Sequence, residues 1–287
     1  MDAAHFINTL EARAGRARKP ERFDFVVLDL AADESLLRRI YQAMGREPLD
    51  WVSLFRDTGW QGHWREGPVL VDARQAPVFQ RELVASLESR PLGLLLQSDH
   101  SPEAIRTHLA RWIQTAHTGE GNLVRVHEPR MIGPLLCSME PAQHQSLLSV
   151  ASRWHWHDGH FWREAGPAEY DPGQVATTAP VIATQQQEGV LPYRLAAEAC
   201  GYASHYRQAL GSRPKPETWV LERLLEAREA GFAWSNHLER WLRIALRQGE
   251  GFQSREPYTD VLAQDELSRN DKLAAMEGAT ETSHAPA

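Results

Sequence analysis

The sequence predicts an α+β protein: a mixed α/β N-terminal lobe, in which helices flank a central sheet, and a smaller all-helical C-terminal lobe. Three observations support this prediction. Short apolar runs alternate with segments of helical periodicity as far as Glu164. Asp158-Gly159, set between alternating aromatic residues, is a strong hairpin signal at the end of that part. Beyond Gly173, hydrophobic residues recur only at helical spacing.

The elements of the N-terminal lobe follow from hydrophobic period and from boundary residues. Apolar runs or strict alternation predict strands at Phe23–Leu30, Trp51–Phe55, Val69–Asp72, Leu92–Leu96 and Asn122–Glu128. Apolar residues three and four apart predict helices at Ala3–Gly15, after Asp33, at Pro77–Ser89, from Pro102 and from Ile132. Ser101 can cap one of these helices, and Pro102 suits its first turn because the missing N–H has no partner there.

The segment Arg153–Glu164, with the sequence RWHWHDGHFWRE, predicts a hairpin closed by a two-residue turn at Asp158-Gly159. In that register His157 faces His160, and Trp156 faces Phe161. The side chain of Asp158 is expected to point away from the strand face.

Composition divides the chain into four segments. Residues 1–165 form the mixed lobe, and residues 166–190 are a linker rich in Pro, Gly and polar residues. Residues 191–263 carry three helical patterns and form the second lobe. Residues 264–287 are polar, acidic and poor in aromatic residues, which predicts a disordered tail.

The bulk properties exclude some classes of function. The formal net charge of −7 argues against a general nucleic-acid binder or a protein that binds anionic membranes, since proteins of both classes bind through an excess of Lys and Arg. Two cysteines make no disulfide framework and are expected to be reduced. No run approaches the roughly 20 apolar residues that a membrane span needs. We therefore expect a cytoplasmic protein.

Two groups of residues invite a catalytic interpretation. His155, His157 and His160 could share one strand face and bind Zn²⁺, which would suit a metal-dependent hydrolase. Aromatic neighbours crowd that face, and no carboxylate is placed to orient the imidazoles, so an aromatic-rich structural hairpin is favoured. Asp29, at the end of the first strong strand, is a possible catalytic carboxylate, but no nucleophile motif accompanies it. We expect no enzyme, no metal and no cofactor.

Four residues are candidates for contact with a protein partner. Arg125 and Arg130 lie with Glu128 in a small ionic cluster, whose favoured interpretation is an ion pair that ties helix to sheet. Trp60 and Trp64 lie in a polar, Gly-containing loop that offers little core to bury them. Trp and Arg often anchor interfaces, although the loop could equally fold back and bury both rings.

The segment R-V-H-E-P-R-M-I at residues 125–132 resembles a signature of the type VI secretion effector adaptors, bacterial chaperones encoded beside the VgrG spike protein. Other pieces follow in the family's order: Val26–Asp29, Ser53–Phe55, Gly67–Val71 and Pro91–Gly93. Where the family has Asp before Pro, this chain has Glu128, which is a poorer helix cap.

The resemblance covers roughly Phe23 to Phe161, and more loosely Gly231–Phe252. It implies a mixed N-terminal lobe, a variable helical C-terminal lobe, and an adaptor-chaperone that loads one toxic effector onto the VgrG spike. The implied partners are the effector and the spike. A metal-dependent hydrolase or a structural subunit of a larger assembly are the alternatives.

Overall fold

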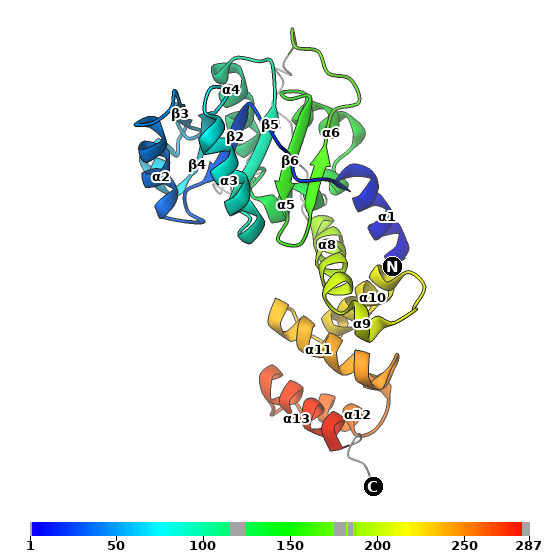
Figure 1. Ribbon diagram of the computed structural model, residues 1–287. Coiled ribbons are helices and arrows are strands. Elements are labelled where there is room, and N and C mark those ends of the chain that lie inside the picture. Colours follow the sequence, from blue (N-terminus) through cyan, green and yellow to red (C-terminus); the bar gives the residue numbers. More distant parts are fainter. Residues whose placement is uncertain (1, 115–123, 175–181, 183–185, 187, 283–287) are drawn as a thin grey trace. The chain divides into compact units, whose positions relative to one another are not determined.

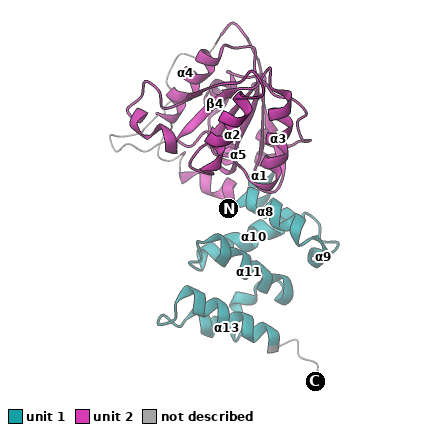
Figure 2. Cartoon of the chain, turned by 60° about the vertical axis from the view of Figure 1, so that its left-hand side comes forward, with its two compact units in different colours: residues 1–7, 195–287 teal, residues 8–194 magenta. Residues whose placement is uncertain are grey.

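The computed structural model describes residues 2–114, 124–174, 182, 186 and 188–282, and it forms two compact units. One unit comprises residues 8–194, and the other comprises residues 1–7 and 195–287 (Figure 2). Helices α1 (Ala3–Arg13) and α8 (Val190–His205) each contribute residues to both units. Part of the linker expected at residues 166–190 lies outside the described residues.

The first unit is built on a seven-stranded antiparallel sheet with the order β1-β7-β6-β5-β2-β4-β3 (Figure 1). Its strands are β1 (Gly15–Arg16), β2 (Phe25–Asp29), β3 (Asp50–Ser53), β4 (Pro68–Asp72), β5 (Gly93–Gln97), β6 (Arg153–His157) and β7 (Trp162–Ala165). The mixed lobe with a central sheet is therefore confirmed, and so is the α+β class.

Helices cover both faces of the sheet (Figure 1). On one face, residues of α2 (Ser35–Met44) and α3 (Pro77–Ser89) join Val26, Val71 and Leu95 in one buried apolar cluster. The opposite face carries α4 (Pro102–Ile113), α5 (Pro129–Ser138) and α6 (Pro141–Leu148). Ser101 accepts a hydrogen bond from the N–H of Ala104 and caps α4, as the sequence predicts.

The backbone of α5 approaches α1 and the sheet closely at Gly133. A Cβ atom at this position would lie 3.4 Å from Ala14 and 3.5 Å from the ring of Trp156. The guanidinium group of Arg13 donates to the carbonyls of Leu136 at 2.9 Å and of Met139, at the C-terminal end of α5. These contacts hold α1 and α5 together against the sheet.

The second unit is helical, as predicted for the C-terminal lobe. Its elements are the C-terminal part of α8, α9 (Arg207–Leu210), α10 (Pro216–Glu229), α11 (Ser235–Gln248), the 3₁₀ turn η2 (Phe252–Ser254), α12 (Tyr258–Leu262) and α13 (Arg269–Thr282). Aromatic rings link them: Trp241 contacts Phe232 and Phe252, and Phe252 contacts Tyr258. None of the helices among the described residues has the length and apolar content required to cross a bilayer.

The prediction of a disordered tail at residues 264–287 is wrong for the part of the tail that the structure describes. Residues 269–282 form α13, and the side chains of Leu273 and Met276 are fully buried. Glu277 also forms an ion pair with Arg240 of α11, with 2.7 Å between Nη2 and Oε2. Few apolar residues suffice here because neighbouring helices cover them.

The strand expected at Asn122–Glu128 is also absent from its described residues, 124–128. The N–H of Val126 donates to the carbonyl of Val124, and the N–H of Glu128 donates to that of Arg125. The alternating valines therefore lie in consecutive turns, which satisfy the backbone locally and lead directly into α5.

The hairpin of β6 and β7 forms, but its register differs from the prediction. His157 pairs with Trp162 and Trp156 with Arg163, so the turn spans the four residues 158–161. The carboxylate of Asp158 accepts hydrogen bonds from the N–H groups of His160 and Phe161, each at 2.8 Å, and stabilises this wider turn. Asp158 is buried rather than turned away from the strands, because it also pairs with Arg163 at 2.6 Å.

Candidate partner-binding site

A pocket of about 410 Å³ lies where β2 ends and α5 begins. Asp29 is the last residue of β2, and Glu128 directly precedes the first turn of α5. The charged side chains that line the pocket are Asp29, Arg90, Arg125, Glu128 and Arg130. Thus the structure brings together Arg125, Arg130 and Asp29, three residues that the sequence singled out separately.

A buried pair forms the polar part of this site. Asp29 is 8% exposed, and its Oδ1 accepts a hydrogen bond from the N–H of Ala31 at 3.0 Å. Its Oδ2 lies 3.8 Å from Nε2 of His127. Nδ1 of His127 is buried without a hydrogen-bond partner among the described residues. Burial lowers the pKa of His127 to about 4 despite the charge of Asp29, so the imidazole is neutral at pH 7.

The three arginines of the pocket differ in their partners. Arg90 pairs with Asp33 at 2.9 Å, and Arg125 pairs with Glu128 at 3.6 Å. Arg130 is exposed and makes no hydrogen bond or ion pair within the described part of the chain. The sequence favoured an ion pair that ties helix to sheet. Arg125 instead pairs with Glu128 in the same loop, so this ion pair does not join the helix to the sheet.

Glu128 does not cap α5. Its side chain makes no capping hydrogen bond, whereas Ser101 caps α4. The extra methylene relative to aspartate, noted in the sequence, thus coincides with a helix start that lacks a side-chain cap. The carboxylate of Glu128 is instead available to Arg125.

Trp60 and Trp64 lie elsewhere, in the loop between β3 and β4, where residues 61–66 form the 3₁₀ turn η1 (Gln61–Glu66). Both side chains are half-buried. The ring of Trp64 lies 5.7 Å from that of Trp51 and packs against the apolar cluster of the sheet. The ring of Trp60 lies 6.3 Å from that of Phe55, which is buried, and 5.9 Å from that of His63 in the same loop.

The two tryptophans should therefore respond differently to mutation. Trp64→Ala is expected to lower the free energy of unfolding by about 1–3 kcal/mol, because the ring packs on the core but is only partly buried. Trp60→Ala should cost roughly 1 kcal/mol or less. Urea denaturation of both variants tests this, with the exposed Trp234→Ala as a control. Equal losses for the two loop variants would contradict the assignment.

The hairpin does not bring its three histidines together. His155 and His157 are buried on one face of β6, whereas His160 is exposed in the turn. Nε2 of His155 lies 3.3 Å from Glu164, and Nδ1 of His157 accepts a hydrogen bond from the N–H of Gly159. Across the described residues, no group of three or more His, Cys, Asp or Glu is arranged to hold a metal ion. The geometry gives the hydrolase alternative no support.

The pKa of His127 predicts a pH dependence of stability. Its pKa is about 4 in the folded protein, against an ordinary 6.5, so unfolding favours proton uptake. The stabilisation is complete above about pH 6.5 and is lost as the pH falls toward 4. Between pH 7 and pH 5 this residue should account for about 1–2 kcal/mol of the decrease in unfolding free energy.

Urea denaturation at both pH values tests this dependence. His127→Gln should show a smaller decrease than the wild type, whereas the exposed His63→Gln should keep the wild-type decrease. Asp29 and Arg125 are the charged neighbours that act on His127, and neither variant alters them. A decrease in His127→Gln as large as in the wild type would refute the prediction.

Comparison with known families adds one finding. The family model described as "Domain of unknown function (DUF4123)" matches residues 25–146. The match runs from β2 to α6 and includes every charged residue of the pocket, but neither the β6–β7 hairpin nor the helical unit. No curated protein and no solved structure matches the chain.

Proposed function

We propose that this protein is an adaptor-chaperone that binds a cognate toxic effector and loads it onto the VgrG spike of a type VI secretion system. The observation that carries the proposal is the DUF4123 match over residues 25–146, a domain known from settings associated with type VI effectors. The ordered motif pieces that resemble the effector adaptors start at Val26 and fall within this match up to Ile132. In this proposal the protein acts in the bacterial cytoplasm, by binding rather than by catalysis.

The geometry of the pocket supports a binding role. Arg130 is exposed, lines a concave surface and has no partner within the described chain. An arginine with free donors on a concave surface can form charge-assisted hydrogen bonds with an acidic group of a partner. Arg125 lines the same pocket, and its ion pair with Glu128 among the described residues is long, at 3.6 Å. We propose these two arginines as anchors for the partner.

Trp60 and Trp64 are candidates for the same role at a second position. The loop that carries them ends at Gly67, and the carbonyl of Gly67 accepts a hydrogen bond from the N–H of Leu30, one residue beyond β2. The loop and the pocket therefore lie at the same end of the sheet. One partner bound at this end could contact both positions.

Co-expression with the effector and the VgrG protein encoded nearby tests the proposal. A tagged adaptor should retain the effector in a pull-down, and soluble effector should decrease when the adaptor is omitted. In a strain that lacks the adaptor, delivery of that effector should fail while other effectors are still delivered. Retention of neither the effector nor the spike would refute the proposal.

Arg130→Ala should weaken the complex by at least about tenfold, which corresponds to about 1.4 kcal/mol. The melting temperature should stay unchanged, since this side chain has no partner within the described residues to lose. Arg81→Ala, at an exposed position of α3, is the matched control and should bind normally. Binding of the Arg130 variant at wild-type strength would exclude the pocket as the contact site and leave the effector interaction itself intact.

A further inference from the structure

Asp29 is a buried carboxylate to which the two arginine anchors assign no role. It ends β2 and lines the pocket between β2 and α5. Its Oδ1 accepts the hydrogen bond from the N–H of Ala31, whereas its Oδ2 accepts none within the described residues. A carboxylate that has lost most of its contact with water needs another source of stabilisation.

The imidazole of His127 does not supply this stabilisation. Its Nε2 lies 3.8 Å from Oδ2 of Asp29, which is too far for a hydrogen bond. Burial lowers the pKa of His127 to about 4 even with Asp29 beside it, so the ring carries no charge at pH 7. No Lys or Arg of the described residues forms an ion pair with Asp29. The carboxylate therefore has no counter-charge within this part of the chain.

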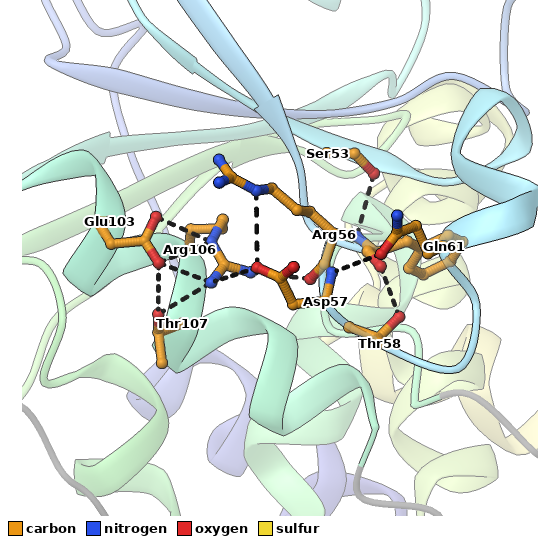
Figure 3. A network of polar contacts seen from close by, with 9 residues as sticks. Ser53, Arg56, Asp57, Thr58, Gln61, Glu103, Arg106 and Thr107 are labelled. Carbon is orange, nitrogen blue, oxygen red and sulfur yellow. Dashed lines mark hydrogen bonds and ion pairs between the residues drawn. The ribbon is translucent and has the colours of Figure 1, made fainter.

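The other buried charged side chains of the described chain are paired. Each lies 2.6–2.7 Å from an opposite charge: Arg106 from Glu103 (Figure 3), Asp158 from Arg163, and Arg223 from Glu226. Such pairing is usual because a buried charge without a counter-charge lowers stability. Asp29 departs from this arrangement at a position that lines a pocket.

The pocket contains a second charge of opposite sign that is also unpaired. Three of its five charged side chains, Arg90, Arg125 and Glu128, form ion pairs within the chain. Arg130, in the first turn of α5, forms none within the described residues. A ligand that matches the unpaired charges therefore carries a cationic group for Asp29 and an anionic group for Arg130.

Burial differs between the two positions and indicates how each charge is reached. Asp29 is buried, whereas Arg130 is exposed. Lys and Arg carry their charge at the end of a long side chain. Such a side chain can enter a pocket of about 410 Å³ while the backbone that carries it stays outside. An acidic residue of the same segment can meet Arg130 at the surface. These features fit a segment of a protein.

We propose that Asp29 binds a Lys or Arg side chain of the cognate effector, while Arg130 binds an acidic residue of the same effector segment. This inference rests on the proposed function and adds a chemical requirement to it, a basic and an acidic residue close together in the effector. The charge of Asp29 is then compensated only in the complex.

The stability of Asp29→Asn tests whether the carboxylate is uncompensated in the free protein. The amide keeps an oxygen for the N–H of Ala31 and removes the charge. Because no opposite charge loses its partner, the midpoint of urea denaturation at pH 7 should stay unchanged or rise. Asp158→Asn is the matched control and should lower the midpoint, since the buried Arg163 loses a counter-charge. A midpoint for Asp29→Asn that falls as far as that of the control would overturn the proposal.

Isothermal titration calorimetry with the effector encoded nearby tests the contact itself. Asp29→Asn should weaken binding about tenfold or more, because the basic side chain loses its counter-charge in a site shielded from water. Glu21→Gln removes the same charge at an exposed position outside the pocket and should bind within about twofold of the wild type. Wild-type affinity of Asp29→Asn would overturn the proposal.

Alanine substitutions in the effector identify its two contact residues. Loss of the basic residue should weaken binding to the wild type about tenfold but have little further effect on Asp29→Asn, since both substitutions remove the same contact. An acidic residue of the same segment should show this coupling with Arg130→Ala. If the wild type binds the effector and no basic residue couples to Asp29, this inference fails and the proposed function stands. If the wild type retains neither effector nor spike, the proposed function fails as well.

Discussion

Replacement of Arg163 by methionine is expected to lower the free energy of unfolding of the sheet-containing unit by about 3–5 kcal/mol. The side chain is 1% exposed and joins three elements. Its Nε lies 2.6 Å from Asp158 in the hairpin turn, and its Nη1 lies 3.0 Å from Glu11 and 2.9 Å from the carbonyl of Ala14. The variant leaves the carboxylate of Asp158 buried without its counter-charge, which is the main cost.

Denaturant unfolding followed by tryptophan fluorescence measures this loss. Arg153→Met, at an exposed position of the same hairpin, is the matched control and should change stability by less than about 0.5 kcal/mol. If Arg163→Met were as stable as this control, the buried network would not be what secures the hairpin to α1.

The hairpin illustrates what the sequence could and could not predict. The strands β6 and β7 were predictable because alternating aromatic residues and Asp158-Gly159 are local signals. The four-residue turn was not, because Asp158 is held by Arg163 as well as by the turn amides, and Arg163 is fixed by Glu11 in α1. Arg163 and Glu11 are 152 residues apart in the chain, so their contact cannot be predicted from local hydrophobic periodicity.

The same limit applies to the candidate site. Arg125, Arg130 and Asp29 could each be picked from the sequence by residue type and position. Their convergence at one pocket required knowing that β2 is an interior strand of the sheet and that α5 starts near its end. Val124 and Val126 alternate like a strand, but the chain there forms turns because α5 must begin at Pro129.

The loop tryptophans differ for a similarly non-local reason. Trp60 and Trp64 share a polar, Gly-containing loop, and nothing in its composition distinguishes them. Trp64 packs against the apolar cluster of the sheet because Trp51 lies beside it on β3, whereas the ring of Trp60 lies against Phe55 and His63. The sequence raised both possibilities for the loop, a buried ring and a partner contact, but could not predict which ring packs on the apolar cluster.

Removal of residues 264–287 is expected to destabilise the helical unit by about 4 kcal/mol or more. The deletion removes the fully buried side chains of Leu273 and Met276, each of which contributes about 2–3 kcal/mol by burial. It also removes the ion pair between Glu277 and Arg240 and the hydrogen bond between Thr280 and Tyr258, which is 3.0 Å long. Composition alone predicted no such effect, because α13 contributes only these two large apolar side chains.

Calorimetry of the truncated chain measures this loss as a lower melting temperature of the helical unit. We expect a decrease of roughly 10 °C or more, because a loss of about 1 kcal/mol lowers the melting temperature of a unit of this size by several degrees. Leu273→Ala should reproduce a large part of the shift without shortening the chain. Ala274→Gln, at an exposed position of the same helix, keeps helix propensity high and should leave the transition within about 2 °C. If the truncated and intact proteins melted at the same temperature, α13 would add nothing to the stability of its unit, which is the result expected for a disordered tail.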